Sequence, residues 1–193
     1  MEGERTKKKV PRTSIALRRF REEDAAALAH WAGDDRILRY FDSLEELAGA
    51  GIHAARRHIT EELAPNPSFM AICVEGGSLP AGAVSVTMLP YGRDLHRAEL
   101  GYFVVPELWG RGIATAAVEV AARFAFQRWS HLERLDAVVD VANGASRRVL
   151  EKNGFVEEGL LRKYVHTRGR SRDVFMYALL RSDLLDLDDD GVF

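Results

Sequence analysis

The residues best suited to chemistry form a short glycine-bearing turn, Trp109-Gly-Arg-Gly-Ile-Ala-Thr115, ahead of a long apolar stretch. Glycines at 110 and 112 permit a sharp turn, and a helix beginning there leaves its first backbone N–H groups without intrahelical partners. Those amides and the positive end of the helix dipole favour a bound phosphate. Arg111 adds a cationic side chain. The turn therefore predicts a phosphate-binding site.

A second polar segment, Asn143-Gly-Ala-Ser146, follows a short β-branched run. Asn143 is a suitable N-cap for a helix through about Lys152, and Gly154 is placed to end it. Ser146 lies three residues after the asparagine, in the first turn of that helix. The segment thus brings an amide and a hydroxyl to one helix N-terminus.

Hydrophobic periodicity places both turns in one α/β domain. Alternating or continuous apolar runs predict seven strands, the last two forming a hairpin: Thr13–Arg18, Ser68–Val74, Ala81–Met88, Ala98–Val105, Asp136–Val141, Phe155–Tyr164 and Arg172–Leu180. A period near 3.6 predicts helices over residues 22–33, 35–63 with two interruptions, 112–128 and 143–152. We expect the third helix to bury Ile113, Ala117, Val120, Ala121 and Phe124.

The composition excludes several classes of protein. A chain of 193 residues fits one domain, which we place at residues 12–182, between a disordered basic tail (1–11) and an acidic tail (183–193). The net charge of −2 argues against a nucleic-acid binder, and no apolar run reaches the roughly 20 residues that span a bilayer. The single cysteine excludes an internal disulfide and a cysteine-based metal cluster, and the histidines show no metal spacing. We expect no metal and a cytoplasmic location, with a nuclear one left open by the basic run Lys7-Lys-Lys-Val-Pro-Arg12.

Taken together, these segments resemble the GNAT superfamily of acetyl-CoA-dependent N-acetyltransferases, and most closely its RimJ/RimL type. The resemblance spans about residues 13–181 and is sharpest in Ala98-Glu-Leu-Gly-Tyr102, in the glycine turn, and in Asn143 to Phe155. It implies a mixed, mostly antiparallel, splayed sheet flanked by helices, opening where the Phe103–Val105 strand parts from the Asp136–Val141 strand. It also implies that acetyl-CoA is the co-substrate and lies in that opening.

The resemblance assigns residues to acetyl-CoA and to catalysis. The cofactor is expected on two sets of backbone groups and on the second helix N-terminus: Phe103, Val104, Val105, Gly110, Arg111, Gly112, Ile113, Ala114, Thr115, Asn143 and Arg147. Backbone N–H groups near Val104 and Val105 would stabilise the oxyanion. Ser146, with Asn143, is expected to assist the departing thiolate, and Glu99 to handle the amine.

Two positions depart from the general superfamily pattern. Trp109 replaces the usual glutamine or arginine at the start of the turn, which is common in the RimJ/RimL type. Leu150 stands where many members carry a tyrosine that protonates the thiolate, seven residues after the asparagine. Any general acid must therefore come from elsewhere in the chain.

The acceptor is the part that the sequence leaves open. It is expected to be a primary amine (a protein N-terminus, a polyamine or a small molecule) held by Trp31, Arg36, Tyr40, Tyr164 and His166. A non-catalytic acyl-CoA-binding module is the alternative that the missing tyrosine allows. A nucleoside-phosphate binder would need the Gly-Lys-Ser/Thr run, which is absent. A monomer and a homodimer both remain open.

Overall fold

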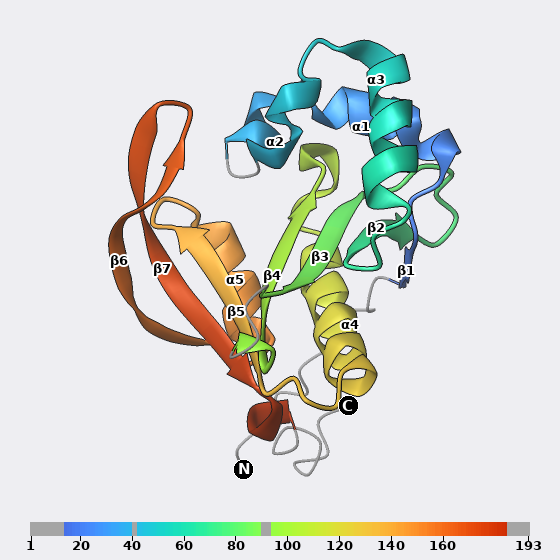
Figure 1. Ribbon diagram of the computed structural model, residues 1–193. Coiled ribbons are helices and arrows are strands. Elements are labelled where there is room, and N and C mark those ends of the chain that lie inside the picture. Colours follow the sequence, from blue (N-terminus) through green and yellow to red (C-terminus); the bar gives the residue numbers. More distant parts are fainter. Residues whose placement is uncertain (1–13, 40–41, 90–93, 185–193) are drawn as a thin grey trace, which may run out of the picture.

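A computed structural model describes residues 14–39, 42–89 and 94–184 of the chain (Figure 1). The predicted basic tail, most of the acidic tail and Tyr40 lie outside these ranges. Within them, no helix is both long and apolar enough to cross a membrane.

The described chain forms one seven-stranded sheet in the order β1-β2-β3-β4-β5-β7-β6. Every neighbouring pair is antiparallel except β4 and β5, which run parallel. Its strands are β1 (Ile15–Arg18), β2 (Phe69–Val74), β3 (Gly82–Met88), β4 (Arg97–Val104), β5 (Arg134–Asp140), β6 (Val156–Thr167) and β7 (Arg170–Leu180). This is the predicted mixed, mostly antiparallel sheet, with a final hairpin that is longer than expected.

The sheet splays between its two central strands. β4 and β5 pair only from Arg97 to Glu99 and from Arg134 to Asp136, although each strand continues beyond that point. Figure 1 shows the two halves of the sheet diverging from this joined end. The predicted opening is therefore confirmed, and it exposes one edge of each strand.

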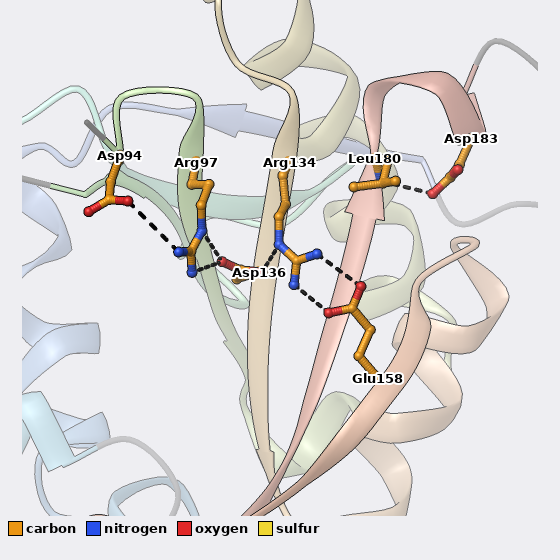
Figure 2. A network of polar contacts seen from close by, with 7 residues as sticks. All are labelled: Asp94, Arg97, Arg134, Asp136, Glu158, Leu180 and Asp183. Atoms are coloured by element: carbon orange, nitrogen blue, oxygen red, sulfur yellow. Dashed lines mark hydrogen bonds and ion pairs between the residues drawn. The ribbon is translucent and has the colours of Figure 1, made fainter. Parts of the chain in front are cut away.

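Buried charge fixes the joined end. Asp136 is 4% exposed and accepts hydrogen bonds from Arg97, with Nη2 at 2.7 Å, and from Arg134 Nε. Arg134 also donates two bonds to Glu158 on β6, at 2.9 and 2.6 Å. Figure 2 shows Asp136 between the two arginines, which come from β4 and β5. One carboxylate thus links the two strands where their pairing begins.

Helices cover both faces of the sheet and build two cores. The first core packs α4 against residues such as Ile72 and Val84, while the second packs α1 and α3 against Ala71 and Ala83. Because neighbouring residues of a strand point to opposite faces, these sets lie on opposite sides of β2 and β3. The helical segments are η1 (Glu22–Asp24), α1 (Ala25–Trp31), α2 (Asp35–Leu38), η2 (Asp42–Leu47), α3 (Gly51–His58), η3 (Ile59–Leu63), η5 (Pro106–Leu108), α4 (Ile113–Arg128) and α5 (Gly144–Lys152).

The predicted buried face of α4 was partly wrong. Ile113, Ala117 and Ala121 are buried as expected, but Val120 and Phe124 are 41% and 43% exposed. The buried stripe continues instead through Val118, Ala122, Ala125 and Phe126. Because apolar residues surround most of this helix, its sequence marks the buried side weakly. Phe124 packs edge-to-face on Trp129 at the surface instead.

Replacing Asp136 with asparagine is expected to lower the free energy of unfolding by about 2–4 kcal/mol, because two guanidinium groups lose a buried anion. Urea unfolding measures the change. Glu158→Gln is the matched control, since its carboxylate is 41% exposed and its loss should cost less than about 1 kcal/mol. Equal effects of the two substitutions would show that Asp136 does not hold the joined end.

Candidate functional site

The glycine turn has the backbone that the sequence predicted. Gly110 and Gly112 have φ values of 75° and 76°, in the left-handed region that favours glycine, and Gly112 caps α4. No side chain among the described residues caps this helix, so the first-turn amides stay directed at the space in front of it. Trp109 closes the preceding loop, because its Nε1 donates to the Val104 carbonyl at 2.6 Å.

The N-terminus of α5 faces the same space. The side chain of Asn143 accepts a hydrogen bond from the Ser146 N–H at 3.1 Å, so Asn143 is the predicted N-cap. Both residues line the cavity in front of α4. Two helix N-termini therefore direct their partial positive charge to one region.

A cavity of about 640 Å³ lies between these helix ends and the end of β4. Its lining includes the glycine turn from Gly110 to Thr115, together with Phe103, Val104 and Ser146. Five of its lining side chains are cationic and none is acidic: Arg36, Arg39, Arg111, Arg148 and Lys152. Such a lining suits a ligand with several phosphate groups and an apolar arm.

The open edge of β4 supplies a backbone donor to this cavity. The N–H of Val105 is already bonded to the Ala81 carbonyl at 2.8 Å, towards β3. In an antiparallel ladder, alternate residues direct their amides to opposite edges. Val104 N–H therefore points to the opening, and of the two predicted oxyanion donors only Val104 fits.

A second cavity, of about 500 Å³, lies on the other side of the opening. Its lining comes mostly from β3, β4, β5 and the β6–β7 hairpin, and includes Glu99, Asp140 and Thr167. Burial by the surrounding protein raises the pKa of Glu99, with a further contribution from Asp136, although water reaches the side chain through the open cleft. Glu99 thus lies where a weakly acidic carboxyl can exchange protons.

The two cavities adjoin through residues that both share, among them Tyr102, Asn143 and Ser146. Tyr102 was not among the predicted site residues. Its hydroxyl donates to the Ser146 carbonyl at 3.1 Å, and burial raises its pKa to about 12 although that hydrogen bond acts in the opposite direction. The sequence did offer a signal for Tyr102, because it directly precedes Phe103, a predicted cofactor residue, on the same strand.

Arg147 was expected at the cofactor but lies elsewhere. Its guanidinium donates to Tyr177 and Glu157, both at 3.1 Å, and stacks over Phe175 at 4.4 Å. The next residue, Arg148, lines the cavity instead. The correction follows from helix geometry, because successive residues differ by about 100° around the axis.

Of the predicted acceptor residues, only some lie at the cavities. Trp31 is buried in the core against Phe20 and Phe103, so it lines neither cavity. Tyr164 is 59% exposed and His166 is also exposed, and neither belongs to the cavity linings. Arg36 does line the phosphate-suited cavity, where it is paired with Asp34 and Glu107. Tyr40 lies outside the described residues.

A break in β6 explains why Tyr164 and His166 point away. The β6–β7 register shifts between Leu161 and Val165, and Lys163 has a φ of 52°. Beyond this irregularity Val165 and Thr167 line the second cavity. Because residues two apart share a face, Tyr164 and His166 point to the other one.

No cluster of three or more His, Cys, Asp or Glu side chains that could hold a metal ion occurs in the part of the chain that the structure describes.

Comparisons with known proteins agree with this geometry. Residues 14–156 match the family model described as "Acetyltransferase (GNAT) domain". The chain is 27% identical over 185 residues to the uncharacterized N-acetyltransferase YoaA of Bacillus subtilis, covering 86% of this chain and 93% of that protein.

Two solved structures share the fold at modest identity. Mycobacterium smegmatis RimJ in complex with CoA-disulfide is 28% identical, with a TM-score of 0.73, over 90% of this chain and 85% of that one. Spermidine N-acetyltransferase from Vibrio cholerae, in complex with CoA and spermine, is 26% identical, with a TM-score of 0.65, over 89% and 98%.

Arg148→Gln is expected to weaken coenzyme A binding about three- to tenfold, because one cation is lost from the lining of the phosphate-suited cavity. Isothermal titration calorimetry measures the dissociation constant. Arg147→Gln makes the same chemical change one position earlier and should leave that constant within about twofold, since Arg147 contacts the sheet instead. A larger effect of Arg147→Gln than of Arg148→Gln would contradict this assignment.

Proposed function

The chain belongs to the GNAT acetyltransferase family and is an acetyl-CoA-dependent N-acetyltransferase of the RimJ/RimL-like type, and we propose that its acceptor is a primary amine that attacks the thioester directly. One observation carries the proposal. A cationic cavity with two helix N-termini adjoins a second cavity that holds a carboxyl of raised pKa. The first suits the phosphates of coenzyme A and the second suits an amine.

In the proposed reaction the amine nitrogen bonds to the acetyl carbon, the carbon–sulfur bond breaks, and the amine's proton and the thiolate must be accommodated. Glu99 is the proposed acceptor of the amine proton, directly or through water, because it lines the second cavity. Val104 N–H is the proposed donor to the oxyanion, since it points to the opening.

Leu150, at the position of the usual tyrosine, is fully buried in the core and cannot protonate the thiolate. Ser146 is the proposed hydroxyl donor near the sulfur, because it lines both cavities. Burial raises the pKa of Tyr102 to about 12, which makes this hydroxyl a poor proton donor to a thiolate, and a serine hydroxyl is no better. We therefore assign Tyr102 a positioning role through its bond to the Ser146 carbonyl.

The direct test is coenzyme A release from acetyl-CoA with a panel of Ser- and Ala-starting peptides, lysine peptides, spermidine and small amines. Turnover with any of these classes supports the proposal. Tight acetyl-CoA binding without turnover by any of them would favour the non-catalytic binding module instead. Absence of acetyl-CoA binding would overturn the assignment of the cationic cavity.

Glu99→Gln is expected to lower kcat about 10²-fold while leaving acetyl-CoA affinity nearly unchanged. A general base works only when ionised, so the rate of the native enzyme should fall as the pH drops through the raised pKa of Glu99, above the ordinary glutamate range. The pH profile of kcat, taken at saturating amine, measures this limb, which the variant should lack. Glu107→Gln is the control, because a bond to its own backbone and Arg36 lower the pKa of Glu107. Retention of the limb in Glu99→Gln would remove Glu99 from the mechanism.

Ser146→Ala and Tyr102→Phe separate the proposed hydrogen-bond donor to the thiolate from the residue that positions it. We expect each substitution to lower kcat about tenfold. Ser146→Ala removes the hydroxyl, and Tyr102→Phe removes the hydrogen bond to the Ser146 backbone carbonyl that positions Ser146. Only a general acid would also remove the alkaline limb of the pH profile. Loss of that limb in Tyr102→Phe would contradict its positioning role.

A further inference from the structure

Two polar atoms on the β6–β7 hairpin have no hydrogen-bond partner among the described residues, namely Thr167 Oγ1 and Arg172 Nε. Both residues line the second cavity, which we call the amine-side cavity because the proposed reaction places the amine there, and Thr167 is only 8% exposed. Buried polar groups in folded proteins are almost always hydrogen-bonded. A donor nitrogen and a hydroxyl left unpaired within one cavity wall would be satisfied by a ligand that supplies an acceptor oxygen.

Arg172 is held in place through one nitrogen of its guanidinium group, while its Nε stays without a hydrogen-bond partner among the described residues. Its Nη1 donates to Asp140 at 2.8 Å, and the two side chains are 25% and 12% exposed. Thr167 lies on the neighbouring strand, since Val165 pairs with Arg172 and Thr167 with Arg170. A guanidinium fixed at one nitrogen presents its Nε–H in the planar geometry that a carboxylate accepts.

The surface outside this wall is rich in arginine. A third cavity, of about 610 Å³, is lined by one acid and five arginines: Asp35, Arg36, Arg39, Arg168, Arg170 and Arg172. It shares Arg39 and Arg172 with the amine-side cavity, so an acceptor that extends outwards meets this surface.

The ion pairs on this surface leave it receptive to an anion. Arg168 pairs with Asp35 and Glu45, each at 3.0 Å, but these acids are exposed and such pairs are weak enough to exchange with a ligand carboxylate. Arg170 is exposed and has no ion pair within the described part of the chain. A polycation would meet guanidinium groups here, which disfavours it.

Resting on the proposed transfer to an amine, we infer that the acceptor is an α-amine with a carboxylate close to it. The amine lies towards Glu99, and the carboxylate accepts hydrogen bonds from Thr167 Oγ1 and Arg172 Nε. Two sources share this chemistry, a free amino acid and a peptide N-terminus with an acidic residue next to it. A polyamine such as spermidine lacks it.

The test compares pairs of acceptors, one member with a carboxylate and the other with an amide in its place. The first pair is alanine and alaninamide. The second pair is the peptides Ser-Asp-Glu-Ala and Ser-Asn-Gln-Ala, both amidated at the C-terminus. Spermidine is included as an amine that carries no carboxylate. We expect the acidic member of at least one pair to have a kcat/KM at least about tenfold higher, and the pair that shows it identifies the source. Equal rates within both pairs, or a preference for spermidine, would overturn the inference and leave the transferase standing.

Variants of Thr167 and Arg172 test whether these two residues cause the preference for an acidic acceptor. Thr167→Val removes the hydroxyl at nearly constant volume, and Arg172→Lys keeps the charge beside Asp140 but removes the Nε donor. Each should reduce the acidic preference to less than about threefold and leave the KM for acetyl-CoA unchanged. Ser171→Ala, which removes a hydroxyl on the same hairpin outside the cavity linings, should keep the preference. An unaltered preference in both Thr167→Val and Arg172→Lys would overturn the inference, and no turnover with any amine would overturn the proposed function and the inference with it.

Discussion

The hydrogen bonds of Asp136 with Arg97 and Arg134 are the constraint on which the site depends. The Arg97–Asp136 bond joins β4 to β5 at one end, where only three residues of each strand pair, and Arg134 holds the same carboxylate from within β5. Beyond that point the strands diverge, so the far edge of β4 carries amides and carbonyls without a strand partner. Unpaired backbone groups are tolerated only where water or a ligand satisfies them. The closed end therefore makes the open end possible.

The opening separates two kinds of electrostatic surface. On one side, five cations and two helix N-termini gather with no acid in the lining, which favours phosphate binding. On the other side lie Glu99 and Asp140, and burial with a neighbouring carboxylate raises the pKa of Glu99. The cavities meet at Tyr102, Asn143 and Ser146, so a polyanionic donor and an amine can approach this junction from different sides.

The phosphate side of the site was predictable from short sequence patterns. The glycines at 110 and 112 and the cap at Asn143 report backbone conformations that depend on few distant residues, and each occurs where it was predicted. Side-chain direction depends on helix phase and strand register, which the sequence encodes less directly. Phase explains the exchange of Arg147 for Arg148, and it explains the exposure of Val120 and Phe124.

The amine side was harder to predict because it is assembled from elements far apart in the chain. Its wall needs the β6 irregularity near Lys163, which turns Thr167 into the cavity and His166 away from it. No local pattern in Arg162–Arg172 marks that change of register. The phosphate side is made by two helix ends and can stay constant while this hairpin varies. The acceptor preference that we propose therefore depends on the hairpin, where Thr167 and Arg172 hold the unpaired atoms.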